Sequence, residues 1–125
     1  MALLYARLGS YSELRQVFLA MHRYPALVSG TGNGDTSIAI AIDAAAKRGA
    51  MGCLGVAVEG GPGIAVKAWD GSGRAADVAA LATLETLKML PAASSGELEA
   101  LARPEAIGGS HVVGYVEPRL ELKHS

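Results

Sequence analysis

Residues 30–71 carry the clearest structural signals of this chain and read GTGNGDTSIAIAIDAAAKRGAMGCLGVAVEGGPGIAVKAWDG. Residues 29–36 are rich in glycine and contain Asn-Gly, which is typical of a loop that uses positive φ angles. Asp35 or Thr36 can cap a following helix that contains Ile38, Ile40, Ile42 and Ala44–Ala46. The isoleucines also alternate, so a strand is the competing interpretation, but the alanine run and the cap favour a helix.

A β-hairpin is predicted directly after this segment. Apolar residues alternate in period two over residues 51–58 and again over residues 63–69. The intervening residues 59–62, Glu-Gly-Gly-Pro, are turn formers, so the two runs read as antiparallel neighbours. Both faces are largely apolar, which indicates that helices cover the strands on at least one side.

The flanking segments read mainly as helices. Residues 1–9 resemble the end of a helix, and Ser10 and Glu13 have capping-box spacing before an apolar stripe. Tyr24-Pro25 should end that helix. A buried helix is predicted over residues 74–90 up to Pro91, and a short one over residues 95–101. The apolar stripe of the helix after Ser10 consists of Leu14, Val17, Phe18 and Met21. The short helix at residues 95–101 can be capped by Ser94 or Ser95.

A closing strand is predicted over residues 111–116, after Gly108-Gly109. The resulting order is α, α, β, β, α, α, β, which predicts an α+β fold in which helices pack around an antiparallel sheet. With 125 residues, half of them apolar, the chain fits a single domain over residues 1–125.

Composition excludes several functional classes. The net charge is −1, from 11 basic and 12 acidic residues, so neither nucleic acid nor an anionic membrane is expected as a partner. No apolar run reaches the roughly 18 residues of a transmembrane helix. The N-terminus lacks the pattern of a secretory signal. With a single cysteine, these features favour a cytoplasmic protein.

No metal site or cofactor is predicted. His22, His111 and His124 have no metal-ligand spacing, and Cys53 has no candidate ligand beside it. Cys53 lies in an apolar strand, where an inert core role is more common than a nucleophilic one. The GTGNG loop lacks the lysine-serine of a phosphate-binding loop, so it is either a tight connection or the border of a substrate pocket.

The segment Lys47-Arg48-Gly49-Ala50 carries the best candidate chemistry. Glycine lets a ligand approach the backbone, so the Ala50 N–H can donate to an oxyanion, while Lys47 can hold a carboxylate or polarise a hydroxyl. The alternative is an ordinary helix C-terminus, with cations at the dipole end and a glycine stop. Lys67 and Asp70 read as an ion pair.

The chain resembles the C-terminal part of the L-asparaginase II family. The matching segments are MHRYPALVSGTGNGDT (21–36), AKRGAMGCLGVAVEGGPGIAVKAWDGSGRAADVAALATLETL (46–87) and HVVGYVEP (111–118). Members of this family are amidohydrolases that convert L-asparagine and water to L-aspartate and ammonia. The resemblance therefore implies part of a fold similar to serine β-lactamases and glutaminases, and a small amide amino acid such as asparagine as the ligand.

The resemblance also implies a site. Lys47 matches the lysine of the family's Lys-X-Gly motif, which is expected beside the nucleophile as a catalytic residue. Gly49 and Ala50 match the strand edge that lines the amide pocket, and Asp35 and Thr36 match its bordering loop. Met51 stands where the family has a glutamate that would suit a substrate ammonium group. The remaining matches, at Lys67, Asp70 and Arg74, are interpreted as structural; Ile107 and Ser110 depart from the family's Asn-X-X-Gly.

Two functional classes remain open. The family's Ser-X-X-Lys motif, which supplies nucleophile and base, belongs to an N-terminal half that this sequence does not contain. The chain is therefore expected to be inactive alone and to need that half as a partner. Alternatively, it is a non-catalytic module that kept the fold, binds a small molecule or itself, and forms a homo-oligomer through exposed apolar surface.

Overall fold

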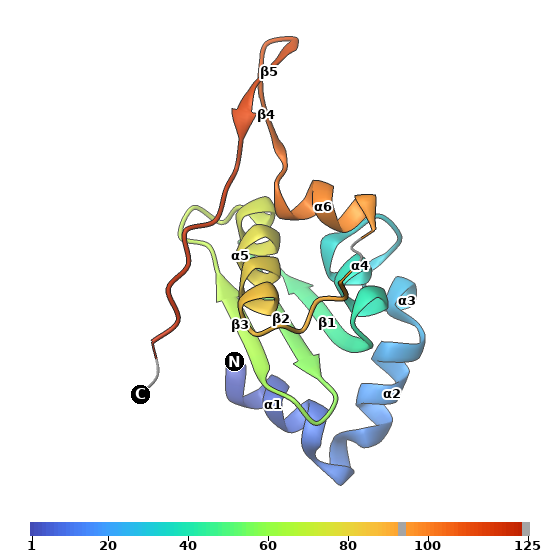
Figure 1. Ribbon diagram of the computed structural model, residues 1–125. Helices are drawn as coiled ribbons and strands as arrows, with labels where there is room; N and C mark the ends of the chain where they lie inside the picture. The colour runs from blue at the N-terminus through green and yellow to red at the C-terminus, as the bar shows by residue number, and fades with distance from the viewer. Residues whose placement is uncertain (93–94, 124–125) are drawn as a thin grey trace.

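The structure, a computed structural model, describes residues 1–92 and 95–123 and has the predicted α+β class (Figure 1). The helices are α1 (Ala2–Ser10), α2 (Arg15–Arg23), α3 (Pro25–Ser29), α4 (Gly34–Ala41), α5 (Gly73–Thr86) and α6 (Gly96–Ala102), with a 3-10 turn at Ser12–Leu14. The strands are β1 (Ala44–Gly49), β2 (Cys53–Val58), β3 (Gly63–Lys67), β4 (Glu105–Gly108) and β5 (His111–Tyr115).

Strands β1, β2 and β3 form an antiparallel sheet with β2 in the centre. The predicted hairpin of β2 and β3 is confirmed, with Gly55 opposite Ala65. On its other side β2 pairs with β1, where Gly55 lies opposite Lys47. One side of β1 therefore remains without a neighbouring strand in this sheet, and it is along this open edge that the polar groups of the candidate site gather.

The helix predicted through Ala46 is wrong in its second half. Helix α4 ends at Ala41, Asp43 takes a left-handed φ of 51°, and β1 begins at Ala44. Ala44–Ala46 are buried in the strand because helices pack against both of its faces, and small side chains let them approach closely. Tertiary packing thus overrides the helix propensity of alanine. The helix C-terminus interpretation of Lys47–Gly49 is wrong as well, since these residues end a strand.

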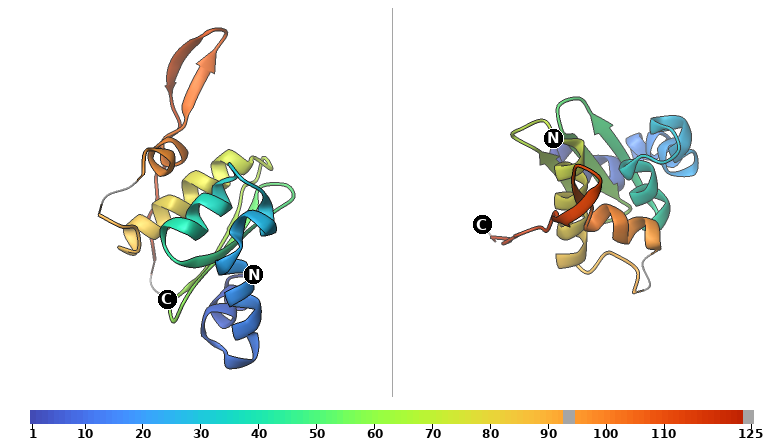
Figure 2. Two further views of the ribbon diagram at one scale, coloured as in Figure 1. Left: turned by 90° about the vertical axis from the view of Figure 1, so that its right-hand side faces the viewer. Right: turned by 90° about the horizontal axis from the view of Figure 1, so that it is seen from above.

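The sheet has a hydrophobic core on each face. Helices α4, α5 and α6 cover one face, with Ile38, Leu54, Leu81 and Leu84 at the centre of that core. Helices α1 and α2 cover the other face, where Phe18 is fully buried. Figure 2 (left) shows α4 and α5 on one side of the sheet and the N-terminal helices on the other. Helices were predicted on at least one side of the strands, and the structure has them on both sides.

Close contact between α1 and the sheet requires glycine. A Cβ on Gly55 would lie 2.0 Å from the Tyr5 ring, and a Cβ on Gly63 would lie 2.1 Å from the Ala6 backbone nitrogen. The Tyr5 ring therefore lies directly over the strand position that faces Lys47 across the β1–β2 pair.

The N-terminal helices differ in detail from the prediction. Ser10 belongs to α1 and forms no cap for α2, so the predicted capping box is wrong. Helix α2 ends before Tyr24-Pro25 as predicted, but Pro25 then opens the short helix α3, which was not predicted. Proline is well suited to this first helical position because its missing N–H would have no helical partner there.

Helices α5 and α6 are confirmed with small changes. Helix α5 ends at Thr86 rather than near residue 90, and its N-terminus is capped by the Ser72 side chain. The Ser95 side chain caps α6 by accepting from the Leu98 N–H, as predicted for one of two serines. The other, Ser94, and likewise His124, lie outside the described residues.

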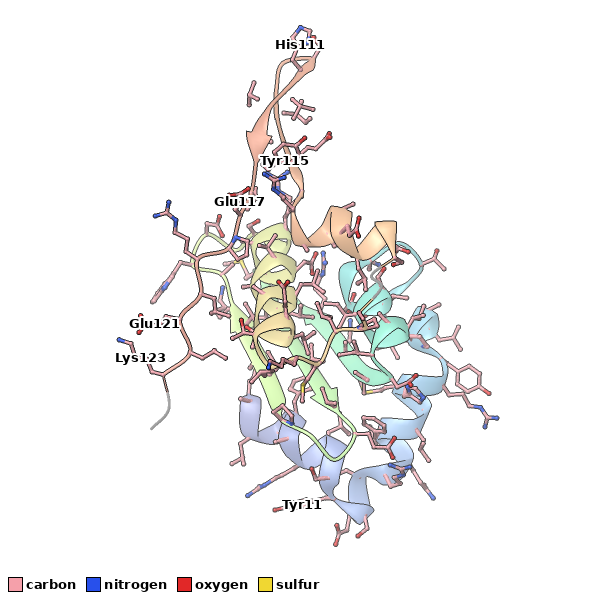
Figure 3. The ribbon with its side chains drawn as sticks, in the orientation of Figure 1. Tyr11, His111, Tyr115, Glu117, Glu121 and Lys123 are labelled. Carbon is pink, nitrogen blue, oxygen red and sulfur yellow. The ribbon has the colours of Figure 1, made fainter. Side chains whose placement is uncertain are left out.

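The predicted strand at residues 111–116 exists as β5 but does not extend the main sheet. It pairs with β4, a four-residue strand that was not predicted, in a separate two-stranded hairpin. The hairpin projects away from the helices and the three-stranded sheet, with His111 at its tip and Tyr115 nearer its base (Figure 3). The chain then returns past α5, where residues 116–120 and α5 line a shallow pocket.

Candidate functional site

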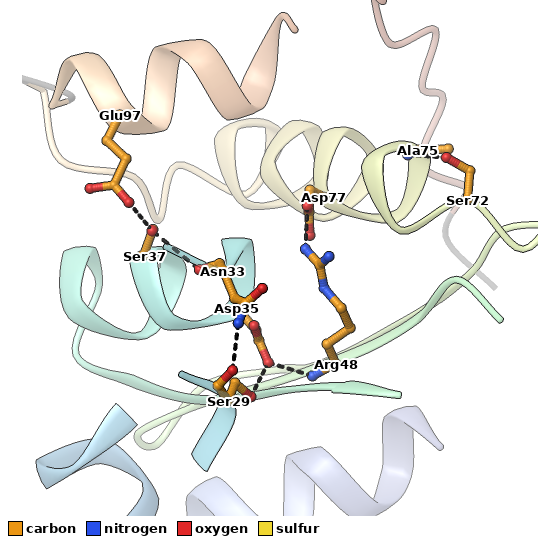
Figure 4. A network of polar contacts seen from close by, with 9 residues as sticks. All are labelled: Ser29, Asn33, Asp35, Ser37, Arg48, Ser72, Ala75, Asp77 and Glu97. Carbon is orange, nitrogen blue, oxygen red and sulfur yellow. Dashed lines mark hydrogen bonds and ion pairs between the residues drawn. The ribbon is translucent and has the colours of Figure 1, made fainter. Parts of the chain in front are cut away.

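A buried carboxylate lies at the open edge of β1. Asp35, in the first turn of α4, has no exposed surface. Its Oδ2 accepts a hydrogen bond from the Arg48 backbone N–H at 2.6 Å and another from the Ser29 hydroxyl. The glycine-rich loop brings α3 and α4 to this edge, so the carboxylate takes the place of a neighbouring strand (Figure 4).

Lys47 joins this group through a serine. Its Nζ donates to Ser29 Oγ at 3.2 Å, so Ser29 accepts from a cation and donates to a carboxylate. In the described part of the chain, the Lys47 ammonium forms this hydrogen bond and no ion pair. Lys47 is exposed, so part of its hydrogen-bonding capacity is available to a ligand.

Ser29 was not among the predicted site residues. It lies 18 positions before Lys47 in sequence, at the end of the unpredicted helix α3. The available signal was its position directly before the glycine-rich loop, in a segment already considered as the border of a pocket.

Arg48 points to the opposite face of the sheet from Lys47. Its guanidinium forms an ion pair with Asp77 of α5, whose carboxylate is almost fully buried. Burial raises the pKa of Asp77 above its ordinary value of 3.8, while the hydrogen bond and charge of Arg48 oppose this rise. A Cβ on Gly34 would lie 2.6 Å from the Asp77 carboxyl carbon, so the start of α4 packs directly against this ion pair.

Among the residues that the structure describes, three buried polar atoms of this network find no protein partner: Asp35 Oδ1, Arg48 Nε and Asp77 Oδ1. Burying a polar atom without a hydrogen bond is costly. The network between α4, β1 and α5 is thus polar and incompletely satisfied by the described residues themselves.

In the described part of the chain, the other predicted site residues take no part in the side-chain hydrogen bonds that join Lys47, Ser29 and Asp35. The Thr36 hydroxyl donates to the Gly30 carbonyl at 2.6 Å and lines a different pocket, beside α6. Gly49, Ala50 and Met51 are exposed at the end of β1 and in the following turn. The Met51 side chain is 72% exposed, with its φ at 59°. The structure thus brings Lys47 and Asp35 together through Ser29, while Met51 faces solvent.

Lys67 and Asp70 form no ion pair within the described residues, which corrects that prediction. Lys67 Nζ instead donates to the backbone carbonyls of Met51 and Ala68, and Asp70 Oδ1 accepts from the Ser72 N–H at 2.9 Å. Arg74 donates to the Glu105 carbonyl at 3.0 Å. All three side chains hold turns or connections in place, in keeping with their structural interpretation.

A groove borders Lys47 on the α1–α2 side of the sheet. This α1–α2 groove has a volume of about 440 Å³ and is lined by Tyr5, Lys47 and six apolar side chains: Leu4, Leu8, Leu14, Val17, Met21 and Val28. Burial, together with the nearby charge of Asp35, raises the pKa of the Tyr5 phenol above its ordinary value of 10.0. The groove therefore combines a neutral, largely apolar wall with a single cation.

The described residues contain no cluster of histidine, cysteine or acidic side chains able to hold a metal ion. Among the same residues, no helix combines the length and apolar character needed to cross a membrane. Cys53 is a free, partly buried thiol in β2.

The structure thus combines a helix-covered antiparallel sheet with a Lys-X-Gly segment that ends edge strand β1, and it places Ser29 and the buried Asp35 beside Lys47. The family model for L-asparaginase II matches residues 1–118, and the chain therefore belongs to the L-asparaginase II family. No curated protein sequence matches the chain.

Proposed function

We propose that this chain forms one wall of an asparaginase-like amidohydrolase site in a cytoplasmic protein. The reaction is hydrolysis of a small amide amino acid such as L-asparagine to L-aspartate and ammonia. The observation that carries the proposal is the Lys47–Ser29–Asp35 arrangement, because it places a cation and a hydrogen-bonded hydroxyl beside the open edge of β1. Family membership supports the amide chemistry.

In this proposal Lys47 binds the substrate carboxylate or the developing oxyanion. Ser29 carries a hydrogen bond between the Lys47 ammonium and the Asp35 carboxylate, so it can pass a proton along that line as charge develops. The Arg48 N–H points off the open edge of β1. Because alternate residues of a strand direct their N–H groups to the same side, Ala50 is the next candidate donor to an oxyanion there.

The nucleophile is proposed to come from elsewhere than these 125 residues. No serine in the sequence has a lysine three positions after it, so the family's Ser-X-X-Lys pair is missing. A partner polypeptide carrying that motif, packed against the open edge of β1, would complete the site. The chain by itself is therefore expected to bind substrate weakly and not to hydrolyse it.

A non-catalytic, self-associating binding module is the second candidate. Met51, at the position of the family's glutamate, is largely exposed and offers no charge to a substrate ammonium group. Apolar side chains of the α1–α2 groove, including Leu4 and Val17, are also more than half exposed. These features favour a surface that is covered by another molecule rather than an independent catalytic centre.

The test separates binding from hydrolysis. Asparagine and aspartate are titrated into the purified chain by calorimetry, and ammonia release is measured in parallel. We expect measurable binding that is lost in Lys47→Met and retained in the control Lys123→Ala, with no ammonia released. Adding a polypeptide that carries Ser-X-X-Lys should restore hydrolysis that depends on Lys47.

Two outcomes would contradict the proposal. Ammonia release by the chain alone, abolished in Lys47→Ala, would show that no second nucleophile is needed. Absence of asparagine and aspartate binding, with no hydrolysis after the partner is added, would favour the non-catalytic module.

A further inference from the structure

We propose that the α1–α2 groove binds a monocarboxylate with an apolar tail, with the carboxylate on Lys47 and the tail between α1 and α2. The ligand class differs from asparagine, and the two proposals share only Lys47. This binding does not require that the site hydrolyse an amide.

The lining of the groove selects an apolar ligand. Apart from the Lys47 amine and the Tyr5 hydroxyl, its side chains carry no charged or hydroxyl group. Its volume of about 440 Å³ lies within the range of small-molecule sites, about 300–1,000 Å³. Asparagine would place its ammonium and carboxamide against Leu8, Leu14 and Met21, where polar groups lose water without gaining partners. An alkyl chain meets no such cost there.

The positive charge in the lining of the groove selects an anionic head group. Among the described residues, Lys47 is the only charged side chain in the lining, and its ammonium is not neutralised by an ion pair with any of them. Asp35, which Ser29 links to Lys47, is fully buried and already accepts two hydrogen bonds. A carboxylate entering from the groove would therefore meet the free side of the ammonium.

The same charge argues against a second copy of the chain as the occupant. An apolar surface placed over the groove would remove water from Lys47 and leave it without a counter-charge, which is costly. A ligand that brings its own carboxylate pairs this cation and covers the exposed Leu4 and Val17 at the same time. The geometry thus matches an amphipathic small molecule better than an apolar protein face.

The probe is sodium decanoate, kept below its micelle concentration and titrated into the full chain by calorimetry. We expect saturable binding with one site per chain. Hexanoate should bind more weakly, by roughly fourfold for each CH₂ that is no longer buried. Decylammonium, with the opposite charge, should not bind.

Variants test the two halves of the site. Lys47→Met keeps the apolar stem and removes the charge, so decanoate should bind about tenfold more weakly, and Lys47→Arg should restore most of the affinity. Val17→Asp places a carboxylate in the groove and should weaken binding by at least about tenfold. Val113→Asp is the matched control, because Val113 is 70% exposed on the projecting β5 strand, and it should bind as the unmodified chain does.

Three other outcomes would overturn the inference. Decanoate binding that is unchanged in Lys47→Met, or equally strong for decylammonium, would show non-specific apolar association. A dimer seen by sedimentation that excludes decanoate, and that Val17→Asp dissociates, would assign the groove to a second copy. Asparagine binding without decanoate binding would overturn this inference and leave the proposed function standing. Decanoate binding without asparagine binding would support this inference and count against the proposed function.

Discussion

The backbone N–H of Arg48 donates to the buried Oδ2 of Asp35 at 2.6 Å, which ties the first turn of α4 to the open edge of β1. An unpaired strand edge normally exposes a row of hydrogen-bonding groups. Here a single side chain serves one of those groups, and the same oxygen accepts from Ser29. The orientation of the candidate site thus depends on Asp35 as much as on Lys47.

Replacing Asp35 by alanine should lower the free energy of unfolding by about 3 kcal/mol, because the Arg48 N–H and the Ser29 hydroxyl lose a charged acceptor in a buried setting. Urea denaturation followed by circular dichroism measures the change. Glu121→Ala, in the exposed C-terminal segment, is the control and should stay within about 0.5 kcal/mol of the unmodified chain. Equal stability of both variants would show that the edge contact contributes nothing.

Gly55→Ala should destabilise the fold by about 3 kcal/mol, because the added Cβ would lie 2.0 Å from the Tyr5 ring and would push α1 off the sheet. Thermal and urea unfolding both report the effect. Gly114→Ala is the matched control, since a Cβ there meets nothing within 4 Å. If the two variants are equally stable, α1 does not pack on β2 as described.

Tyr5 should make stability fall at alkaline pH. Its pKa is raised in the folded state, so the unfolded chain loses the phenol proton first as the pH rises past 10.0. The stabilisation is therefore complete below that pH and is lost as the pH rises toward the folded-state pKa. The free energy of unfolding, measured at a series of pH values, should decline less steeply in Tyr5→Phe.

Tyr11→Phe supplies the comparison, because Tyr11 is about half exposed and its alkaline decline should match that of the unmodified chain. Asp35→Asn should lower the pKa of Tyr5, since the Asp35 charge contributes to its rise. Absorbance of the phenolate follows this titration directly.

The β4–β5 hairpin should exchange its amide hydrogens much faster than the main sheet. It is a two-stranded element that projects from the rest of the chain, with Ile107 and Val113 largely exposed, and such hairpins are marginally stable in water. Hydrogen exchange followed by mass spectrometry should show early exchange over residues 105–115 and late exchange around Val56, which is fully buried. Equal protection of both regions would indicate that another molecule covers the hairpin.

Local patterns predicted the parts of the fold that depend on neighbours in sequence. The hairpin of β2 and β3 followed from alternation on both sides of a Gly-Gly-Pro turn, and the Ser95 cap followed from residue type. Local sequence patterns could not predict that Ala44–Ala46 form a strand. Alanine favours a helix intrinsically, and only the two helical layers above and below β1 make a strand the better solution.

The candidate site was predictable in its parts but not in its connections. Lys47 and Asp35 were selected from the sequence. Ser29, which joins them, lies 18 positions before Lys47, and it reaches Lys47 only because α3 and the glycine-rich loop reverse the direction of the chain. The β4 strand was missed for a different reason. It has only four residues, between Pro104 and a Gly-Gly turn, and this is too short for a pattern to emerge.

The contact between Gly34 and Asp77 has a consequence for related sequences. The Asp77 carboxylate fills the space that any side chain at position 34 would need, while Arg48 holds that carboxylate in place. Residues 34, 48 and 77 should therefore change together rather than one at a time. A relative with alanine at position 34 should carry a smaller residue at position 77 and an uncharged residue at position 48.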